Sequence, residues 1–246
     1  VEVVEKYGAD TLRFMLITGN TPGNDMRFYW ERVESARNFA NKIWNASRYM
    51  LMNLEGFDKD FKPEESDFTL ADKWILSRYA KTAEGVTKSL DNFELGEAGR
   101  MIYEFIWNEF CDWYIELTKA RLYDKENERA KNTALYVLSY VLEHTLRLLH
   151  PFMPFLTEEI WQKVPHDGQW KSIMIADWPT ADASLRDDAA EAQMTAIMET
   201  IKTVRNLRAE VGAAPGHKSE VMLHFTESSL RPVFAENEGY LKALAA

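Results

Sequence analysis

The chain has 246 residues, of which 46% are hydrophobic and 13% aromatic, so it can bury a large core and is not disordered. Its single cysteine, Cys111, excludes an intramolecular disulfide and a zinc cluster built from several cysteines, and it suits a reducing cytosol. The formal net charge of −10 argues, taken alone, against a nucleic-acid partner, because phosphate binding favours a basic surface.

Apolar residues at helical spacing predict long helices over the first two thirds of the chain. The first spans 3–16 and ends near Gly19, before a loop at 18–25 that is rich in Gly, Pro and Asn. A long helix at 30–54, stopped near Gly56, is followed by an acidic connector. Thr69 with Asp72 three residues later predicts a capping box that opens the next helix.

Three further helical segments complete this part, at 69–90, 99–122 and 127–149. Pro151 and Pro154 then interrupt the chain before a short helix that ends near Val164. Four or five long helices with short links are typical of a bundle. Since no apolar run approaches the ~18 residues that a membrane span needs, and no basic-then-apolar leader is seen, we expect neither a membrane span nor a signal peptide.

The pattern changes after Pro165. Residues 172–179 are short and β-like, 186–210 and 228–241 are helical, and 212–216 break the pattern. Residues 220–225 alternate with period two, which is typical of a half-buried strand, and a lone strand needs a partner from elsewhere in the chain. The predicted fold is mainly α, with a helical bundle over 1–180 and a small α/β unit over 181–246.

Charge is unevenly distributed along the chain. Residues 27–50 hold five basic and two acidic residues, and 202–218 hold four basic and one acidic. The balance reverses in 55–67, with six acidic and two basic residues. Local basic surfaces on an acidic body remain compatible with RNA binding.

The helix at 30–54 has a broad apolar arc that includes Phe39, Ile43, Trp44 and Met50, which we expect to be buried. Its opposite face is rich in groups that recognise bases. Asparagine can hydrogen-bond adenine, lysine can donate to a base or a phosphate, and a tyrosine ring can stack on an unpaired base. The alternative, which spacing alone favours, is an ordinary polar face exposed to solvent. The residues of this polar face are Glu34, Asn38, Asn41, Lys42, Asn45, Arg48 and Tyr49.

Four motifs occur in a fixed order: Y-G-A-D-T-L-R-F (7–14), N-F-A-N-K-I-W-N-A-S-R (38–48), E-F-I-W-N-E-F-C-D-W-Y-I-E-L (104–117) and L-H-P-F-M-P-F-L-T-E-E-I-W (149–161). Together they closely resemble the region after the catalytic core in valyl-tRNA synthetases, which are class I aminoacyl-tRNA synthetases. The resemblance runs from about residue 1 to 216. It implies an anticodon-binding helical bundle, followed by part of a junction domain cut before a coiled-coil arm.

The resemblance also implies roles and partners. Lys42 and Tyr49 are the residues that carry over best to anticodon recognition, with Asn38, Asn41, Asn45 and Arg48 beside them. The implied partners are tRNA(Val) and the catalytic and editing domains of the same chain, in a cytoplasmic monomer. No H-I-G-H or K-M-S-K-S motif occurs, so no ATP site is expected in this part. The resemblance places ATP and Mg in the parent's catalytic domain, and implies no cofactor or metal here and no activity of this part alone.

The remaining candidates favour structural roles. The aromatic stripe at 107–114 has the helical spacing of a core, and we interpret it so. Paired carboxylates at 112 and 116 and at 158–159 lack a cleft or a nucleophile motif, and the second pair suits a helix N-terminus after Thr157. Five histidines show no metal-ligand spacing. For Asp10 and Arg13 we expect an ion pair at the interface with the catalytic core, or an exposed i,i+3 pair.

Two alternatives to the valine-specific hypothesis remain. One is the equivalent domain of an isoleucyl- or leucyl-tRNA synthetase, because Y-G-A-D-x-L-R is shared among synthetases for branched aliphatic amino acids. The other is a helical scaffold for protein interactions without an RNA role, which the acidic net charge favours. Salt-dependent binding of tRNA separates the scaffold from both synthetase hypotheses.

Overall fold

The structure is a computed structural model that describes residues 1–19, 25–54, 57–166, 168–214, 217 and 219–245. These residues form helices and connecting loops and contain no strand, so the mainly α class is confirmed. The longer helices are α2 (Ala9–Thr18), α3 (Trp30–Asn53), α4 (Leu70–Asp91), α5 (Leu95–Glu104), the π-helix η2 (Phe105–Tyr114), α6 (Ile115–Leu122), α7 (Glu128–Leu149), α8 (Pro154–Trp161) and α9 (Asp188–Glu210).

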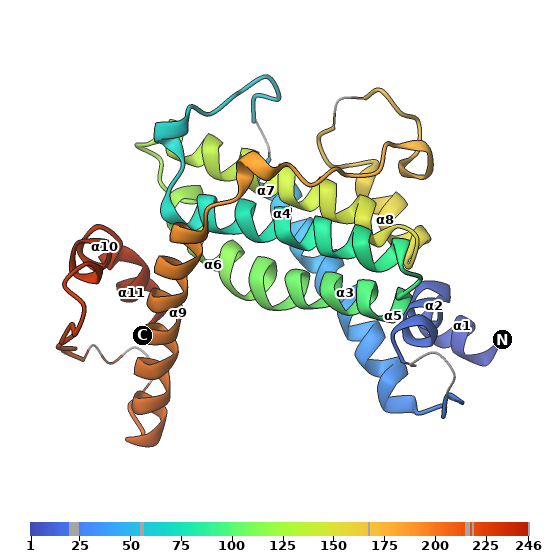
Figure 1. The fold of residues 1–246 in the computed structure, drawn as a ribbon, viewed down its shortest axis with the longest axis horizontal. Helices are drawn as coiled ribbons and strands as arrows, with labels where there is room; N and C mark the ends of the chain where they lie inside the picture. The colour runs from blue at the N-terminus through green and yellow to red at the C-terminus, as the bar shows by residue number, and fades with distance from the viewer. Residues whose placement is uncertain (20–24, 55–56, 167, 215–216, 218, 246) are drawn as a thin grey trace.

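A bundle built around α4 contains the core (Figure 1). α4 packs against α5, η2, α7 and α9, while α3 packs against α2, η2, α7 and α8. The largest fully buried side chains are aromatic, which matches the aromatic richness of the sequence. They include Phe39, Tyr79, Phe105, Tyr114, Phe152 and Trp161.

Local sequence signals explain where several helices begin. The Thr69 hydroxyl and the Asp72 carboxylate form the predicted capping box of α4. Asn127 caps α7 and Asp187 caps α9, each by accepting a backbone N–H three residues later. Gly8, at φ 87°, separates α1 (Glu2–Tyr7) from α2, so the single helix predicted at 3–16 is two helices.

The aromatic segment at 105–114 differs from the predicted α-helix, because it is wound as a π-helix in continuity with α5 and α6. Phe110, Trp113 and Tyr114 are buried, which confirms the core interpretation for them. Trp107 is only partly buried and packs against the core from outside. The wider winding alters which residues share a face. In a π-helix, residues five apart lie on the same side of the helix, whereas an α-helix separates them by about 140°.

The C-terminal part departs from the predicted α/β unit. α9 joins the bundle where its Glu191 accepts from Arg78 at 3.3 Å and binds Lys81 at 3.0 Å, and its far end extends beyond the bundle (Figure 1). Residues 219–225 have no regular secondary structure and form no strand, because no described segment pairs with them. Residues 172–179 contain the 3₁₀ turn η3 (Ile173–Ile175), and α10 (Leu230–Glu236) and α11 (Glu238–Leu244) end the chain. The division at residue 180 stays a prediction.

The buried face of α3 is rotated from the predicted arc. Phe39, Ile43 and Met50 are buried as expected, but Trp44 is 39% exposed and lies 5.8 Å from the Lys163 ammonium. The buried positions repeat every three or four residues, and Trp44 falls one step beyond that stripe while Ser47 falls on it. The predicted Trp44 core contact is therefore wrong.

Other sequence-based expectations need correction or cannot be tested. Glu158 and Glu159 lie in the second half of α8 rather than at its N-terminus, because the helix begins at Pro154. Most of the loop predicted at 18–25, the stop at Gly56 and part of the 212–216 breaker lie outside the described residues. No described helix is sufficiently long and apolar to cross a membrane.

Asp10 and Arg13 bind other groups in the described structure and do not form the i,i+3 pair with each other, while their expected place at an interface with the catalytic core stays a prediction. The Asp10 carboxylate accepts the backbone N–H groups of Phe155 at 3.3 Å and Leu156 at 2.6 Å, which lie in the first turn of α8. Arg13 donates to the carbonyls of Pro151 at 2.8 Å and Phe152 at 3.3 Å. The Y-G-A-D-T-L-R motif therefore docks α2 onto the α7–α8 corner.

Candidate nucleic-acid interface

A shallow groove of about 420 Å³ runs between α3 on one side and η2 and α6 on the other. Four of the six predicted base-contacting residues line it from α3, namely Asn38, Lys42, Asn45 and Tyr49. The opposite wall is built from Cys111, Ile115, Glu116 and Lys119. The groove thus combines amide, ammonium, phenol and carboxylate groups on a partly apolar floor, which suits an unstacked base better than a metal or a small apolar ligand.

Tyr49 forms the aromatic part of the groove. Its hydroxyl lies 3.2 Å from that of Tyr123, a side chain that is 62% exposed at the end of α6. The Lys119 ammonium lies 5.9 Å from the Tyr49 ring centroid. Partial burial raises the pKa of Tyr49 well above its usual range, with Tyr123 and Glu116 adding to the effect, so the phenol stays neutral and can donate.

Lys42 is held in place rather than freely exposed. Its side chain is 23% exposed, its ammonium forms an ion pair with Asp112, and it lies 4.0 Å from the Trp107 ring centroid. Trp107 stacks on Tyr103 at 5.5 Å and 19°, and Tyr103 packs against the buried Phe39 at 4.8 Å. The position of Lys42 is therefore set by a stack of aromatic rings that begins in the core.

The other predicted residues of this face make fewer specific contacts than Lys42 and Tyr49. Asn41 and Arg48 are exposed on α3 but do not line the groove. Asn38 accepts a hydrogen bond from Arg37 at 3.3 Å, and Asn45 is exposed at the groove. Four residues of this surface were not predicted from the sequence, namely Asp112, Trp107, Lys119 and Tyr123. Lys119 and Tyr123 lie four residues apart at the end of α6. This spacing of a cation and an aromatic ring on one helix face could have predicted their place in the surface.

A second basic element adjoins η2 from α9. Lys202 and Arg205 lie 5.7 and 5.8 Å from the Trp113 ring centroid, and Trp113 follows Asp112 in η2. Arg208 lies one turn further along α9 and donates to Ser219 at 2.8 Å. Lys202 and Arg205 are thus exposed beside the helix that forms one wall of the groove, and Arg205 also donates to the Leu244 carbonyl, while Lys218 of the predicted basic stretch at 202–218 lies outside the described residues.

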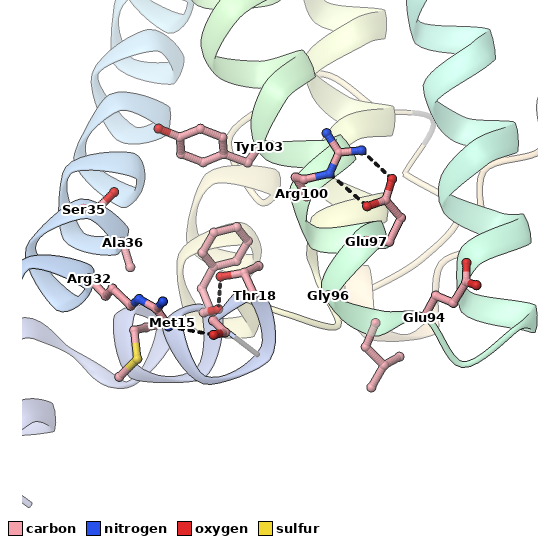
Figure 2. A pocket seen from close by; sticks show the side chains of 13 residues that line it. Met15, Thr18, Arg32, Ser35, Ala36, Glu94, Gly96, Glu97, Arg100 and Tyr103 are labelled. Atoms are coloured by element: carbon pink, nitrogen blue, oxygen red, sulfur yellow. Dashed lines mark hydrogen bonds and ion pairs between the residues drawn. The ribbon is translucent and has the colours of Figure 1, made fainter. Parts of the chain in front are cut away.

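A larger groove of about 1050 Å³ lies between α2, α3 and α5 (Figure 2). Its cations are already engaged: Arg100 pairs with Glu97 and Glu104, and Arg32 donates to the Gly19 carbonyl at 2.6 Å. Size alone does not make it the better candidate, because none of the residues predicted to contact bases lines it.

Two other kinds of site, a metal site and a reactive cysteine, find little support among the described residues. No group of three or more His, Cys, Asp or Glu side chains is arranged there to hold a metal ion. Cys111 is mostly buried, and burial raises the pKa of its thiol to about 12, so it stays protonated and unreactive at neutral pH.

A family model described as the anticodon-binding domain of tRNA ligases matches residues 72–223. The chain is 55% identical over 246 residues to a valine–tRNA ligase from Carboxydothermus hydrogenoformans, in a match that covers 100% of this chain and 27% of that protein. It is 50% identical to the valine–tRNA ligase of Bacillus thuringiensis subsp. konkukian, over 98% of this chain and 27% of that protein. Helix α3 lies outside the family match but inside these alignments.

The chain therefore spans 27% of the length of these curated relatives. Among solved structures, it is similar to the ternary LeuRS–tRNA–LeuAMS complex from Agrobacterium radiobacter K84, with a TM-score of 0.56 and 21% identity. That match covers 76% of this chain and 21% of the other chain. At this identity it supports the helical fold alone.

Proposed function

Because the chain belongs to the family of anticodon-binding domains of tRNA ligases, we propose that it binds the anticodon arm of tRNA(Val) in a valine–tRNA ligase. The observation that carries the proposal is 55% identity along the whole chain to a valine–tRNA ligase. The leucyl alternative has only a fold likeness at 21% identity.

The groove between α3 and η2 is the proposed contact with anticodon bases. Tyr49 offers a ring for stacking and Lys42 a hydrogen-bond donor, with Asn38 and Asn45 along the same wall. Arg48 and Asn41 flank the groove, and the cations of α9 supply phosphate contacts. A local basic surface explains how a chain of net charge −10 binds RNA.

The parent protein joins valine to its tRNA with ATP, in this proposal, and acts as a cytoplasmic monomer. ATP and Mg²⁺ bind in its catalytic domain, outside this chain, whose sequence has no H-I-G-H or K-M-S-K-S motif. The catalytic and editing domains are the proposed partners within the same polypeptide. The present part then only holds the anticodon end while the acceptor end reacts elsewhere.

The test is binding of anticodon stem-loops to the purified chain at several salt concentrations. We expect affinity for a valine stem-loop to fall linearly on a log–log salt plot, as it does when cations neutralise phosphates. A stem-loop with a different anticodon should bind more weakly. A chain that binds no stem-loop in a salt-dependent way would instead be the protein-interaction scaffold.

Lys42→Ala separates base reading from phosphate binding. If Lys42 donates to a base, the variant should lose discrimination among anticodons as well as affinity. If Lys42 contacts only phosphate, affinity should fall by one factor for all stem-loops, and the salt dependence should flatten. In that case base reading belongs to the asparagines of α3.

A further inference from the structure

The ion pair between Lys42 and Asp112 offers RNA both a donor and an acceptor at one point of the groove rim. Lys42 is 23% and Asp112 48% exposed, so the carboxylate is the more open member. Lys42 binds one carboxylate oxygen, Oδ1, and a carboxylate has about four lone-pair sites. Asp112 therefore keeps acceptor capacity toward solvent while it is paired.

The π-helix places this carboxylate. Trp107 and Asp112 are five residues apart in η2, and both contact the Lys42 side chain. A regular α-helix would turn residues five apart away from each other by about 140°. The π winding thus brings a ring that supports Lys42 and an anion that partners it to the same side of the helix.

Base edges differ in whether they match such a pair. Adenine and cytosine present an exocyclic amino donor beside an unprotonated ring nitrogen that accepts. Guanine and uracil present a carbonyl acceptor beside a ring N–H donor, which is the reverse order. A carboxylate next to an ammonium complements the first arrangement and opposes the second, where acceptor would face acceptor and donor would face donor.

We propose that Lys42 and Asp112 together read the Watson–Crick edge of an amino-bearing anticodon base, and that Asp112 is a specificity-determining residue. This rests on the proposed function. Valine anticodons share a middle adenine and a final cytosine, both of which carry the matching edge. Guanine at the middle position belongs to alanine and uracil at the final position to isoleucine, so a reader of amino groups rejects both neighbours.

The test removes single amino groups from the RNA. Valine stem-loops are made with purine riboside in place of the middle adenosine, or with pyrimidin-2-one riboside in place of the final cytidine. Wild-type chain should bind one of the two about tenfold more weakly than the unmodified stem-loop, which is the order of discrimination of one specific base contact. The position that responds identifies the base that Asp112 contacts.

The Asp112→Ala variant should bind the unmodified stem-loop about as weakly as wild type binds the modified stem-loop that responds. Its affinity should not fall further when the amino group is removed from the RNA. Asp112→Asn keeps one acceptor oxygen and should restore part of the preference. Glu104→Ala is the matched control, because Glu104 is also 48% exposed and ion-paired, with Arg100 on α5. It should leave the preference for amino groups intact.

Two results overturn the inference. Equal binding of modified and unmodified stem-loops by wild type would show that no amino group is read. A change in Asp112→Ala that is equal for all stem-loops would show that Asp112 acts through charge or by holding Lys42. Failure of wild type to bind any stem-loop would be recognisable separately, since it overturns the proposed function itself.

Discussion

Two carboxylate–cation pairs lie on the two sides of the same aromatic segment, and they differ in how completely they are satisfied. Asp72, at the start of α4, is 0% exposed and accepts from Thr69, from the Tyr114 hydroxyl at 2.5 Å, and from Arg121 at 2.6 and 2.7 Å. Asp112 is half exposed, and its partner is Lys42, which lines the groove.

The difference separates a structural pair from one that is available for recognition. Every oxygen of Asp72 is used by neighbouring helices, so the pair joins α4, η2 and α6 and offers nothing to a ligand. The Lys42–Asp112 pair is screened by water and stabilises the fold little, but its donors and acceptors are accessible. An ion pair near solvent with spare hydrogen-bonding capacity is therefore the better marker of a binding surface.

The largest expected effect is on the buried pair. Asp72→Ala leaves Arg121 and Tyr114 without their shared partner and removes the α4 capping box, so we expect a loss of about 3–5 kcal/mol in the free energy of unfolding. Asp112→Ala should cost at most about 1 kcal/mol. Urea unfolding of both variants measures the contrast, and similar losses for the two would show that the two ion pairs do not differ in their contribution to stability.

The same contrast holds between two aromatic residues of α3. Phe39 is 0% exposed and contacts Phe14 and Tyr103, so Phe39→Ala should cost about 3–5 kcal/mol. Trp44 is 39% exposed, and Trp44→Ala should cost only about 1 kcal/mol. Thermal unfolding of the two variants checks both values. A Trp44 variant as unstable as the Phe39 variant would mean that α3 is rotated relative to the structure.

Another buried carboxylate, that of Glu143, makes the contrast depend on pH. Burial alone would raise the pKa of Glu143, but His144, Arg147 and the Trp161 indole N–H lower it from 4.5 to about 2. Because the folded pKa is depressed, its contribution is present above pH 4.5 and is lost as the pH falls toward 2. At about 1.4 kcal/mol per pKa unit, the contribution is at most about 3.5 kcal/mol.

Glu143→Gln should therefore be less stable than wild type at pH 7 and lose less stability than wild type between pH 7 and pH 3. Urea unfolding at both pH values measures this. Glu159→Gln, an exposed carboxylate paired with Lys163, is the control and should follow wild type. If all three proteins lose stability equally, Glu143 does not titrate as described.

The smallest expected effect is confined to binding. Base–aromatic stacking contributes about 1–3 kcal/mol per base, so Tyr49→Ala should weaken stem-loop binding by roughly ten- to a hundredfold. Tyr49→Phe keeps the ring and loses the hydrogen bond to Tyr123, so it should retain most of the affinity. Equal weakening in both variants would assign the effect to the hydroxyl rather than to stacking.

Patterns local in sequence were sufficient for much of the fold. The Thr69–Asp72 capping box, the long helix that became α3 and the buried aromatics at 110, 113 and 114 were all predicted from spacing. The alternation at 220–225 also predicted a strand, which does not form because a strand depends on a partner that local pattern does not supply.

The motifs and the polar face of α3 are properties of the sequence by itself, because helical periodicity and residue type determine which side chains share one helix face. The meeting of Lys42 with Asp112, 70 residues away, was decided only by tertiary structure. So were the π winding that turns Asp112 toward α3 and the use of Asp10 and Arg13 to dock α8. Contacts between distant segments depend on how helices pack and wind, and no local period in the sequence carries that information.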